Sequence, residues 1–562
     1  MNAFNESRRH FLMQTGLGVA SLTALPSIAK AMEGMGMKDN MMMPKITPNK
    51  ASPNFHPDVE FDLFCKPASL PILDGSKTNL LQYTATLIKG PKETITQLPN
   101  SFLGDIIRLK KGQKVRVNLH NGLSQPTVTH WHGLHVPQMM DGHPMYFIDS
   151  GETLVYEFEV LNRANLNIYH PHQHGVTGKQ VYFGLAGAMI VNDEDEAKLE
   201  LPSGEFEIPL VIQDKQFDMN NQLVYPSSMH NKMTGITGDK ILVNGHSNFQ
   251  LEVASRAYRL RIVNASTSRI YKLAWNDEMP VIVIGVDGGL LEQPEIKPYV
   301  MLAPGERLDV WADFSGRNEG SELTLKSLAF SGVLPKMGMS TGAIPVGSEY
   351  PILTVRITKK VSETHKLPML LSTFKHYEIS DTANPNNPIP IGITEAPMSM
   401  LLNGAPYEFN NPLPFERIKV GSIQLIEIFH AHGEGHMKMD NDSQGEQQQH
   451  KNGHEMGRGS MGRNSRMGGM GGGMMHLSMA HPIHLHGQQF EIVSRSFSGE
   501  STSYDTVKDG FINSGLKDVV LVMPMEKVKI IKPFQDFKGL FVYHCHNLEH
   551  EDMGMMREFS VE

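Results

Sequence analysis

Residues 544–555 read HCHNLEHEDMGM, a run in which one cysteine stands between two histidines. Side chains two positions apart on a β-strand point to the same face, so His544 and His546 would lie side by side while the sulfur of Cys545 points the opposite way. One strand would then carry a thiolate metal ligand on one face and two imidazole ligands on the other. This arrangement gives a short covalent path between two metal sites, which suits electron transfer.

The cysteine-bearing face can be completed from other residues of the last third. His550 follows Cys545 by five positions and Met555 follows it by ten, while His481 opens the segment HPIHLHG at 481–487. Two histidines, one cysteine and a weak axial methionine form the ligand set of a blue-copper site. A structural zinc site on Cys545 is the alternative, and a lone methionine more often fills a core. Zinc would not account for the remaining histidine pairs.

Histidine pairs separated by one residue recur in richer contexts elsewhere. The segments read HWHG at 130–133, HPHQHG at 170–175 and HPIHLHG at 481–487. Together with 544–546 they supply eight imidazoles that can pair on strand faces, enough for a cluster of several metal ions. A single pair would be weak support in a chain of 562 residues with 26 histidines, so the prediction depends on the four segments together.

Alternation of apolar and polar residues at a period of two predicts β-strands through most of the chain. Residues 114–119, 153–160 and 259–263 are examples, and Gly, Pro and Asn interrupt such runs at short intervals. Many short strands with frequent turn residues are typical of sandwiches and barrels.

A weak internal repeat predicts three copies of one β-sandwich. Similar strand openings occur as GETLVY at 151–156, GERLDV at 305–310 and MEKVKI at 525–530. We therefore expect domains at 55–200, 201–365 and 366–562.

Composition excludes several classes of protein. Lys and Arg number 51 against 60 Asp and Glu, and a net charge of −9 argues against a general nucleic-acid binder or a polybasic membrane-surface protein. Two cysteines, Cys65 and Cys545, rule out a disulfide framework. The 36 methionines and 26 histidines are high counts, and both residue types bind soft or borderline metals.

The first 31 residues have the layout of a twin-arginine export signal. Arg8 and Arg9 precede a moderately apolar stretch, and Ala29-Lys30-Ala31 offers a cleavage site between small residues. A retained membrane anchor is the alternative, but the stretch is barely of bilayer length and contains polar residues. We expect a periplasmic protein with no membrane anchor after processing.

The four histidine segments, in this order, resemble those of the multicopper oxidases, and HPIHLHG and HCHNLEHEDMGM match almost letter for letter. The resemblance covers the whole chain after the signal. It implies an all-β fold of three consecutive cupredoxin-like Greek-key β-sandwich domains and four copper ions. By position, it implies a type 1 copper on His481, Cys545, His550 and Met555, a type 2 copper on His130 and His484, and a type 3 pair on His132, His170, His172, His486, His544 and His546.

The remaining histidines and the second cysteine fall outside this ligand set. His174 is expected to be structural or to lie behind the ligands. The middle third holds only His230, His246 and His365, with no pairs, so it is expected to be a copper-free spacer. Cys65 has no cysteine partner and is expected to be a small buried apolar residue.

The reaction implied by the resemblance is one-electron oxidation of a substrate at type 1 copper, coupled to reduction of O2 to water. That reduction consumes protons, so acidic residues are needed near the cluster. Glu551 resembles the family's proton-delivering glutamate, and Asp141 matches its acidic residue near type 2 copper. The alternative for each is an ordinary surface or turn carboxylate.

A methionine-rich segment bears on the substrate. Residues 433–475 lack Val, Ile, Leu, Phe, Tyr and Trp, so they cannot form a packed core, yet they contain eight methionines. The segment ends just before Met479 and His481, beside the expected point of electron entry, and residues 32–54 form a second methionine-rich tail. Thioethers suit Cu(I). A flexible loop with incidental methionines is the alternative.

Periplasmic cuprous oxidases of the CueO type also carry a methionine-rich insertion, but theirs lies earlier in the third domain. Met479 matches a substrate-copper methionine of that group, whereas Leu477 stands where an aspartate is expected. The sequence therefore leaves the position of a substrate Cu(I) site open.

Three functions are compatible with these features. The first is a cuprous oxidase that acts in copper tolerance, with Cu(I) and O2 as substrates. The second is a laccase-like oxidase of phenols or aromatic amines. The third is a copper-sequestering protein with incidental oxidase activity, which the complete ligand set argues against. We expect a monomer without nucleic-acid partners.

Overall fold

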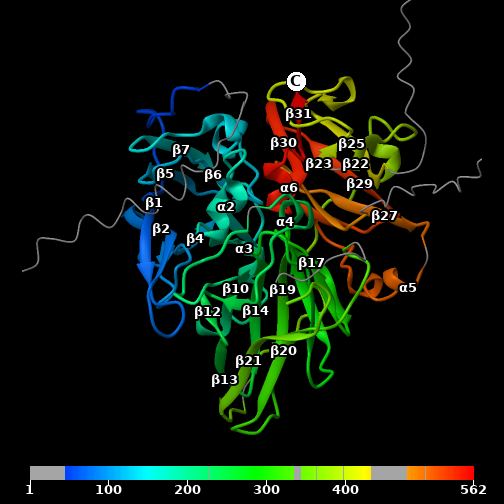
Figure 1. Ribbon diagram of the computed structural model, residues 1–562. Helices are drawn as coiled ribbons and strands as arrows, with labels where there is room; N and C mark the ends of the chain where they lie inside the picture. The colour runs from blue at the N-terminus through cyan, green and yellow to red at the C-terminus, as the bar shows by residue number, and fades with distance from the viewer. Residues whose placement is uncertain are drawn as a thin grey trace, which may run out of the picture.

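The structure, a computed structural model, describes residues 45–226, 228–334, 344–362, 364–396, 398–431, 478–499 and 501–562. Its body consists of β-strands arranged in six sheets, two from each third of the chain. Figure 1 shows the first third in blue and cyan, the middle third in green and the last third in yellow to red, packed around a common centre. The expected all-β fold of three consecutive cupredoxin-like sandwiches is confirmed. Each pair of sheets lies within one of the expected domains, whose exact limits stay a prediction.

The first third contains sheets ordered β2-β1-β5-β7 and β3-β4-β9-β8-β6. Their strands are β1 Val59–Leu70, β2 Thr78–Lys89, β3 Ile95–Thr96, β4 Ile106–Lys110, β5 Lys114–Asn121, β6 Thr129–His132, β7 Thr153–Glu159, β8 Asn165–Pro171 and β9 Gly187–Asn192.

The middle third contains sheets ordered β12-β11-β10-β14-β19-β16-β17 and β13-β21-β20-β15-β18. Their strands are β10 Glu207–Lys215, β11 Lys240–Val243, β12 His246–Ser247, β13 Gln250–Ala254, β14 Ala257–Asn264, β15 Tyr271–Trp275, β16 Val281–Val286, β17 Gly289–Lys297, β18 Val300–Leu302, β19 Arg307–Asp313, β20 Glu322–Ser327 and β21 Tyr350–Lys359.

The last third contains sheets ordered β23-β22-β25-β29-β27 and β24-β31-β30-β26-β28. Their strands are β22 Ile389–Ala396, β23 Ser399–Leu402, β24 Arg417–Ile418, β25 Ser422–His430, β26 His481–Leu485, β27 Glu491–Phe497, β28 Val519–Val522, β29 Glu526–Phe534, β30 Gly539–Cys545 and β31 Met556–Val561.

The internal repeat corresponds to one strand arrangement used three times. In each third a parallel pair is followed by an antiparallel neighbour: β1-β5-β7, β10-β14-β19 and β22-β25-β29. The three similar openings found in the sequence begin β7, β19 and β29, which hold the same position in their sheets. The predicted strands at 114–119, 153–160 and 259–263 are confirmed as β5, β7 and part of β14.

The second sheet of each third explains where ligands can be placed. Its parallel pairs are β4-β9, β13-β21 and β24-β31, and beyond them lie β8-β6, β20-β15 and β30-β26. In the first and last thirds these strands carry the paired histidines. In the middle third, β15 reads YKLAW and β20 reads ELTLKS, with no histidine or cysteine.

Helices play a minor part. The described α-helices are α2 Thr177–Tyr182, α3 Glu194–Ala197, α4 Met229–Thr234, α5 Ser501–Tyr504 and α6 Leu548–Asp552. Helices α2 and α6 lie beside each other at the centre of the molecule, one from the first third and one from the last (Figure 1). Within the described ranges, no helix has the length and apolar character needed to cross a membrane.

Candidate metal centre

The paired histidines meet at the interface of the first and last thirds. On β6 and β8, His130 lies opposite His170, and on β26 and β30, His484 lies opposite His544. The other four follow these residues on the same faces or just beyond the strand ends: His132, His172, His486 and His546. All eight imidazoles predicted for the cluster are buried and brought together.

One nitrogen of each imidazole faces a common centre. The Nε2 atoms of His130 and His484 are 3.4 Å apart. The Nε2 of His544 lies 3.3 Å from the Nε2 of both His172 and His486. In a third group, the Nδ1 of His132 lies 3.2 Å from the Nε2 of His546 and 3.5 Å from the Nε2 of His170. These sets of one pair and two triads match the type 2 and type 3 ligands implied by the resemblance.

Burial favours the neutral form of four of these imidazoles, those of His170, His172, His484 and His486. It lowers the pKa of His170 to about 4 and that of His172 to about 3, because a buried site disfavours the imidazolium cation. Burial also lowers the pKa of His484 and His486 well below the usual value. A neutral imidazole presents a free lone pair, which is the form that binds a metal ion.

Asp141 holds two of the ligand histidines by their outer nitrogens. His130 Nδ1 donates to the Asp141 backbone oxygen at 2.5 Å, and His486 Nδ1 donates to Oδ2 at 2.6 Å. The carboxylate is fully buried, and burial raises its pKa well above the ordinary value, although Lys532 opposes this. Such partners behind a ligand fix its ring orientation and tautomer.

Glu551 lies behind a second pair of ligands. Its Oε1 is 3.5 Å from Nδ1 of His172, and its Oε2 is 3.2 Å from Nδ1 of His544. The residue belongs to the short helix α6, and its side chain is fully buried. Burial alone would raise the pKa of Glu551, but the adjacent His172 and His544 hold it below the ordinary value.

A second site lies on the opposite face of β30. The Sγ of Cys545 is 3.4 Å from Nδ1 of His481 and 3.6 Å from Nδ1 of His550. Met555 is buried in the same apolar cluster as Cys545, and its backbone oxygen accepts from the Cys545 amide at 3.0 Å. The predicted type 1 residues are therefore neighbours, and all four are fully buried.

The donor sets fit copper. The site on β30 brings together two imidazoles and the Cys545 sulfur, with Met555 buried in the same apolar cluster, and the other site offers eight imidazoles. Hard cations such as magnesium or calcium prefer oxygen ligands, which the groups of converging nitrogens do not supply.

The sequence did not identify an acidic partner of His481. Glu395, on β22, lies with its Oε1 2.8 Å from His481 Nε2, and the same oxygen accepts from the Met479 amide at 2.9 Å. Its side chain is 1% exposed. The only signal was a carboxylate inside the otherwise apolar strand IPIGITEA.

Two more residues behind the cluster were also missed. Asp518 precedes β28, and its Oδ1 lies 3.1 Å from Nε2 of His132. Arg307, the first residue of β19 in the middle third, places Nη1 2.9 Å from the same nitrogen. For Asp518 the available signal was a charged residue directly before the apolar strand VVLV, and for Arg307 it was a buried charge at the start of a strand.

The remaining sequence-predicted residues lie away from the ligand groups. His174 is half-buried near Tyr407, with ring centroids 5.1 Å apart, and Cys65 is a buried free thiol beneath Tyr83. Within the described ranges, no histidine of the middle third belongs to a group of converging ligands. The export signal at 1–31, residues 32–44 of the methionine-rich tail, the segment 433–475 and Leu477 lie outside the described residues.

Comparison with protein families agrees with this geometry. Residues 80–196 and 469–562 match two family models, each described as multicopper oxidase. These ranges contain every residue of the predicted ligand set.

Individual proteins extend the match over the whole fold. A laccase of Bacillus subtilis is 28% identical over 466 residues, covering 77% of this chain and 79% of that protein. The crystal structure of the 2F4 variant of the McoA multicopper oxidase of Aquifex aeolicus is 30% identical, with a TM-score of 0.70, covering 90% of this chain and 97% of that one. A Campylobacter jejuni multicopper oxidase described as a metallo-oxidase is 25% identical, with a TM-score of 0.66, covering 92% and 94%. The chain belongs to the multicopper oxidases, copper-binding oxidoreductases that use O2 as electron acceptor.

Proposed function

We propose that this oxidase acts on Cu(I), converting it to Cu(II), and serves in copper tolerance. The proposal includes four copper ions, with one type 1, one type 2 and two type 3 ions held by the residues assigned above. Bound there, copper supplies one-electron chemistry that couples oxidation of the substrate to reduction of O2 to water.

The contact between Glu395 and His481 carries this proposal. His481 turns Nδ1 toward Cys545, so Nε2 is its outward edge, and that edge is occupied by the Glu395 carboxylate at 2.8 Å. A buried carboxylate attracts a cation and covers the edge against which an aromatic substrate would pack. Coulomb attraction is strong in such a low-dielectric site, so a cationic substrate is favoured over a phenol.

Methionine and histidine residues occur close to Glu395 or His481, either in the sequence or in space. Met398, in the turn after β22, is 70% exposed, and the ring centroid of His430 lies 5.7 Å from that of His481. Residues 433–475, with their eight methionines, rejoin the described chain immediately before Ser478 and Met479. Thioethers and imidazoles bind Cu(I) well.

Glu551 and Asp141 are proposed to handle the protons that O2 reduction consumes. Each carboxylate oxygen of Glu551 faces an outer nitrogen of a ligand histidine, so the side chain is placed to relay a proton beside the cluster. Asp141 Oδ1 is buried with no hydrogen-bond partner among the described residues, so it offers a second position for a proton. Positioned carboxylic acids of this kind act as general acids.

The function is tested by steady-state O2 consumption with Cu(I) and with a bulky phenol. Glu395→Gln keeps the side-chain shape but removes the charge, so we expect the kcat/KM for Cu(I) to fall and that for the phenol to stay level or rise. Glu427→Gln, on the neighbouring strand β25, is the matched control and should leave both unchanged. If the kcat/KM for the phenol fell as much as that for Cu(I), or more, the laccase-like alternative would be favoured. The similarity to a laccase is the observation that supports this alternative. Wild-type protein that binds copper but turns over neither substrate would favour sequestration.

We further propose a periplasmic monomer, exported by the twin-arginine route. The sequence around Arg8 and Arg9 supports this. Replacing both arginines by lysine should retain the unprocessed protein in the cytoplasm, as measured by fractionation, and light scattering reports the oligomeric state.

A further inference from the structure

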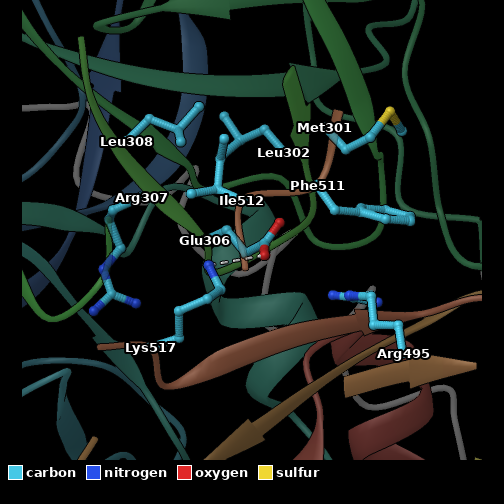
Figure 2. Close-up of a pocket in the computed structure, with 9 residues that line it drawn as sticks. All are labelled: Met301, Leu302, Glu306, Arg307, Leu308, Arg495, Phe511, Ile512 and Lys517. Atoms are coloured by element: carbon cyan, nitrogen blue, oxygen red, sulfur yellow. Dashed lines mark ion pairs between the residues drawn. The ribbon is translucent and has the colours of Figure 1, made fainter. Parts of the chain in front are cut away.

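One side chain of the middle third reaches the histidine cluster. Arg307 is 1% exposed and lies at the wall of a small pocket between the middle and last thirds, as Figure 2 shows. Its guanidinium touches all three thirds of the chain. Nε donates to the Leu166 backbone oxygen at 3.0 Å, Nη1 donates to that of Gly305 at 2.9 Å, and Nη1 and Nη2 donate to the two oxygens of Asp518 at 2.5 and 2.6 Å.

Asp518, held in this bidentate pair, contacts two ligand histidines. Its Oδ1 lies 3.1 Å from Nε2 of His132, and its backbone oxygen accepts from Nδ1 of His484 at 2.8 Å. The rings of His132 and His484 are stacked, with centroids 3.8 Å apart and planes 11° apart. The orientation of both rings therefore depends on where Asp518 sits.

His132 has a particular need for such a partner. Among the eight cluster histidines it is the one that turns Nδ1 inward and Nε2 outward. When Nδ1 binds a metal ion, Nε2 carries the ring proton and requires an acceptor, which Asp518 supplies. The planar guanidinium fork fixes the plane of that carboxylate, whereas an ammonium group makes only point contacts.

The backbone around Arg307 is equally constrained. Gly305 has a φ of +82°, and a Cβ at this position would lie 2.9 Å from atoms of the His546 ring. This turn of the middle third is therefore in close contact with a cluster histidine. Asp287 accepts from the Arg307 amide at 2.9 Å and from the Asp518 amide at 3.2 Å. The Lys517 ammonium lies 3.2 Å from carboxylates of both Asp287 and Glu306, the latter pair dashed in Figure 2.

We propose that Arg307 is a positioning residue of the trinuclear cluster. Acting through Asp518, it fixes the orientation of the His132 ring, with Nδ1 toward the centre of the cluster. It also connects the middle third to the two thirds that supply the cluster histidines. The inference rests on the copper assignments of the proposed function, and it gives the middle third a role beyond that of a spacer. It does not depend on which substrate delivers the electrons.

The test compares copper retention at the two kinds of site in purified, copper-loaded Arg307→Lys and Arg307→Met. We expect the blue type 1 absorption to persist, because all its ligands come from the last third. The affinity of the histidine cluster for copper, measured by titration with a chelator, should fall about 10- to 100-fold, which is the usual effect of removing a residue that holds a metal ligand. The spectroscopic signature of the type 3 copper pair should be lost as well. Lysine should not rescue this signature, because it cannot form the bidentate pair.

Arg269→Lys is the matched control, because Arg269 is also a buried arginine of the middle third and binds Asp214 at 2.6 Å without touching a ligand histidine. Cluster copper retained at the wild-type level in both Arg307 variants would overturn the proposal. So would loss of cluster copper to the same degree in Arg307→Lys and Arg269→Lys, since the effect would then be general destabilisation. If Arg307→Met fails to fold, the copper retention of Arg307→Lys alone tests the proposal. None of these measurements uses Cu(I) as substrate. The role of Arg307 can therefore be confirmed or overturned independently of whether the enzyme oxidises Cu(I).

Discussion

The Nδ1 of His481 lies 3.4 Å from the Sγ of Cys545, while His544, the residue preceding that cysteine, faces the histidine cluster on the other side of β30. The two sites are thus joined through one peptide unit of a single strand. This arrangement makes the cysteine the natural place to separate them experimentally.

Cys545→Ser should abolish the intense thiolate-to-copper colour and all oxidase activity, because a hydroxyl is a poor ligand for copper. The cluster histidines remain, so copper bound at the cluster should persist in metal analysis. Cys65→Ser, at the other cysteine, should keep the colour. A blue Cys545→Ser protein would show that the type 1 assignment is wrong.

Glu551→Gln separates proton delivery from copper binding. The amide keeps the shape of the side chain between His172 and His544 but cannot relay a proton, so copper content should be unchanged while reduction of O2 slows by about 100-fold or more. Reoxidation of the fully reduced enzyme by O2 measures this directly. An unchanged rate would remove Glu551 from the mechanism.

Replacement of residues 433–475 by a short Gly/Ser linker tests the methionine-rich segment. Without core hydrophobes, the segment should be dispensable for folding and copper content, but its loss should lower the efficiency with Cu(I) and leave oxidation of a bulky phenol unchanged or faster. Changing only its eight methionines to serine keeps the covering chain and removes the thioethers. Wild-type kinetics with Cu(I) in both variants would make the segment a tolerated insertion and raise the laccase-like alternative.

Acid should weaken the middle third through Glu207. Burial favours the neutral acid, but the charges of Arg261, Arg259 and Arg108 outweigh it and hold the pKa of Glu207 at about 2, against an ordinary value of 4.5. Because the folded-state pKa is depressed, the stabilisation is complete above pH 4.5 and is lost as the pH falls toward 2. The difference corresponds to roughly 3 kcal/mol.

Glu207→Gln should therefore lower the free energy of unfolding at neutral pH by about this amount, in the range found when one partner of a buried pair is removed. The gap to the wild type should narrow between pH 4.5 and 2. Denaturant titrations followed by tryptophan fluorescence, with Trp275 and Trp311 in the same third, measure both effects. A gap that is independent of pH would contradict the electrostatic explanation.

The sequence could identify the residues that the structure brings together in these groups because their signal is local. Each group of ligands lies on one strand or in the turn that follows it, as in the pair His130 and His132 or the set within 544–555. The period of two residues along a strand then determines which side chains point to the same face. The threefold repeat was visible for the same reason, since β7, β19 and β29 begin with similar residues at equivalent positions.

The partners behind the ligands could not be predicted in this way. Glu395 meets His481 across 86 positions of sequence, and Arg307 meets His132 across 175. The sequence pointed to Leu477 as the position where an aspartate is expected, whereas the carboxylate that contacts His481 belongs to β22. Such contacts depend on how sheets pack against one another, which the residues of a single strand do not encode.

The wide separation of the cluster ligands has a consequence for biosynthesis. His130 and His484 are 354 positions apart, and His132 and His546 are 414 apart. Synthesis must pass His546 before the cluster has its full set of ligands, and Met555 before the cysteine site has its own, and long-range closure of this kind is a late event in folding. A chain that ends before residue 544 lacks Cys545 together with His544, His546, His550 and Met555, and would be unable to pass electrons to oxygen. Copper loading at both sites thus reports that synthesis has passed these residues and that folding has brought the first and last thirds together.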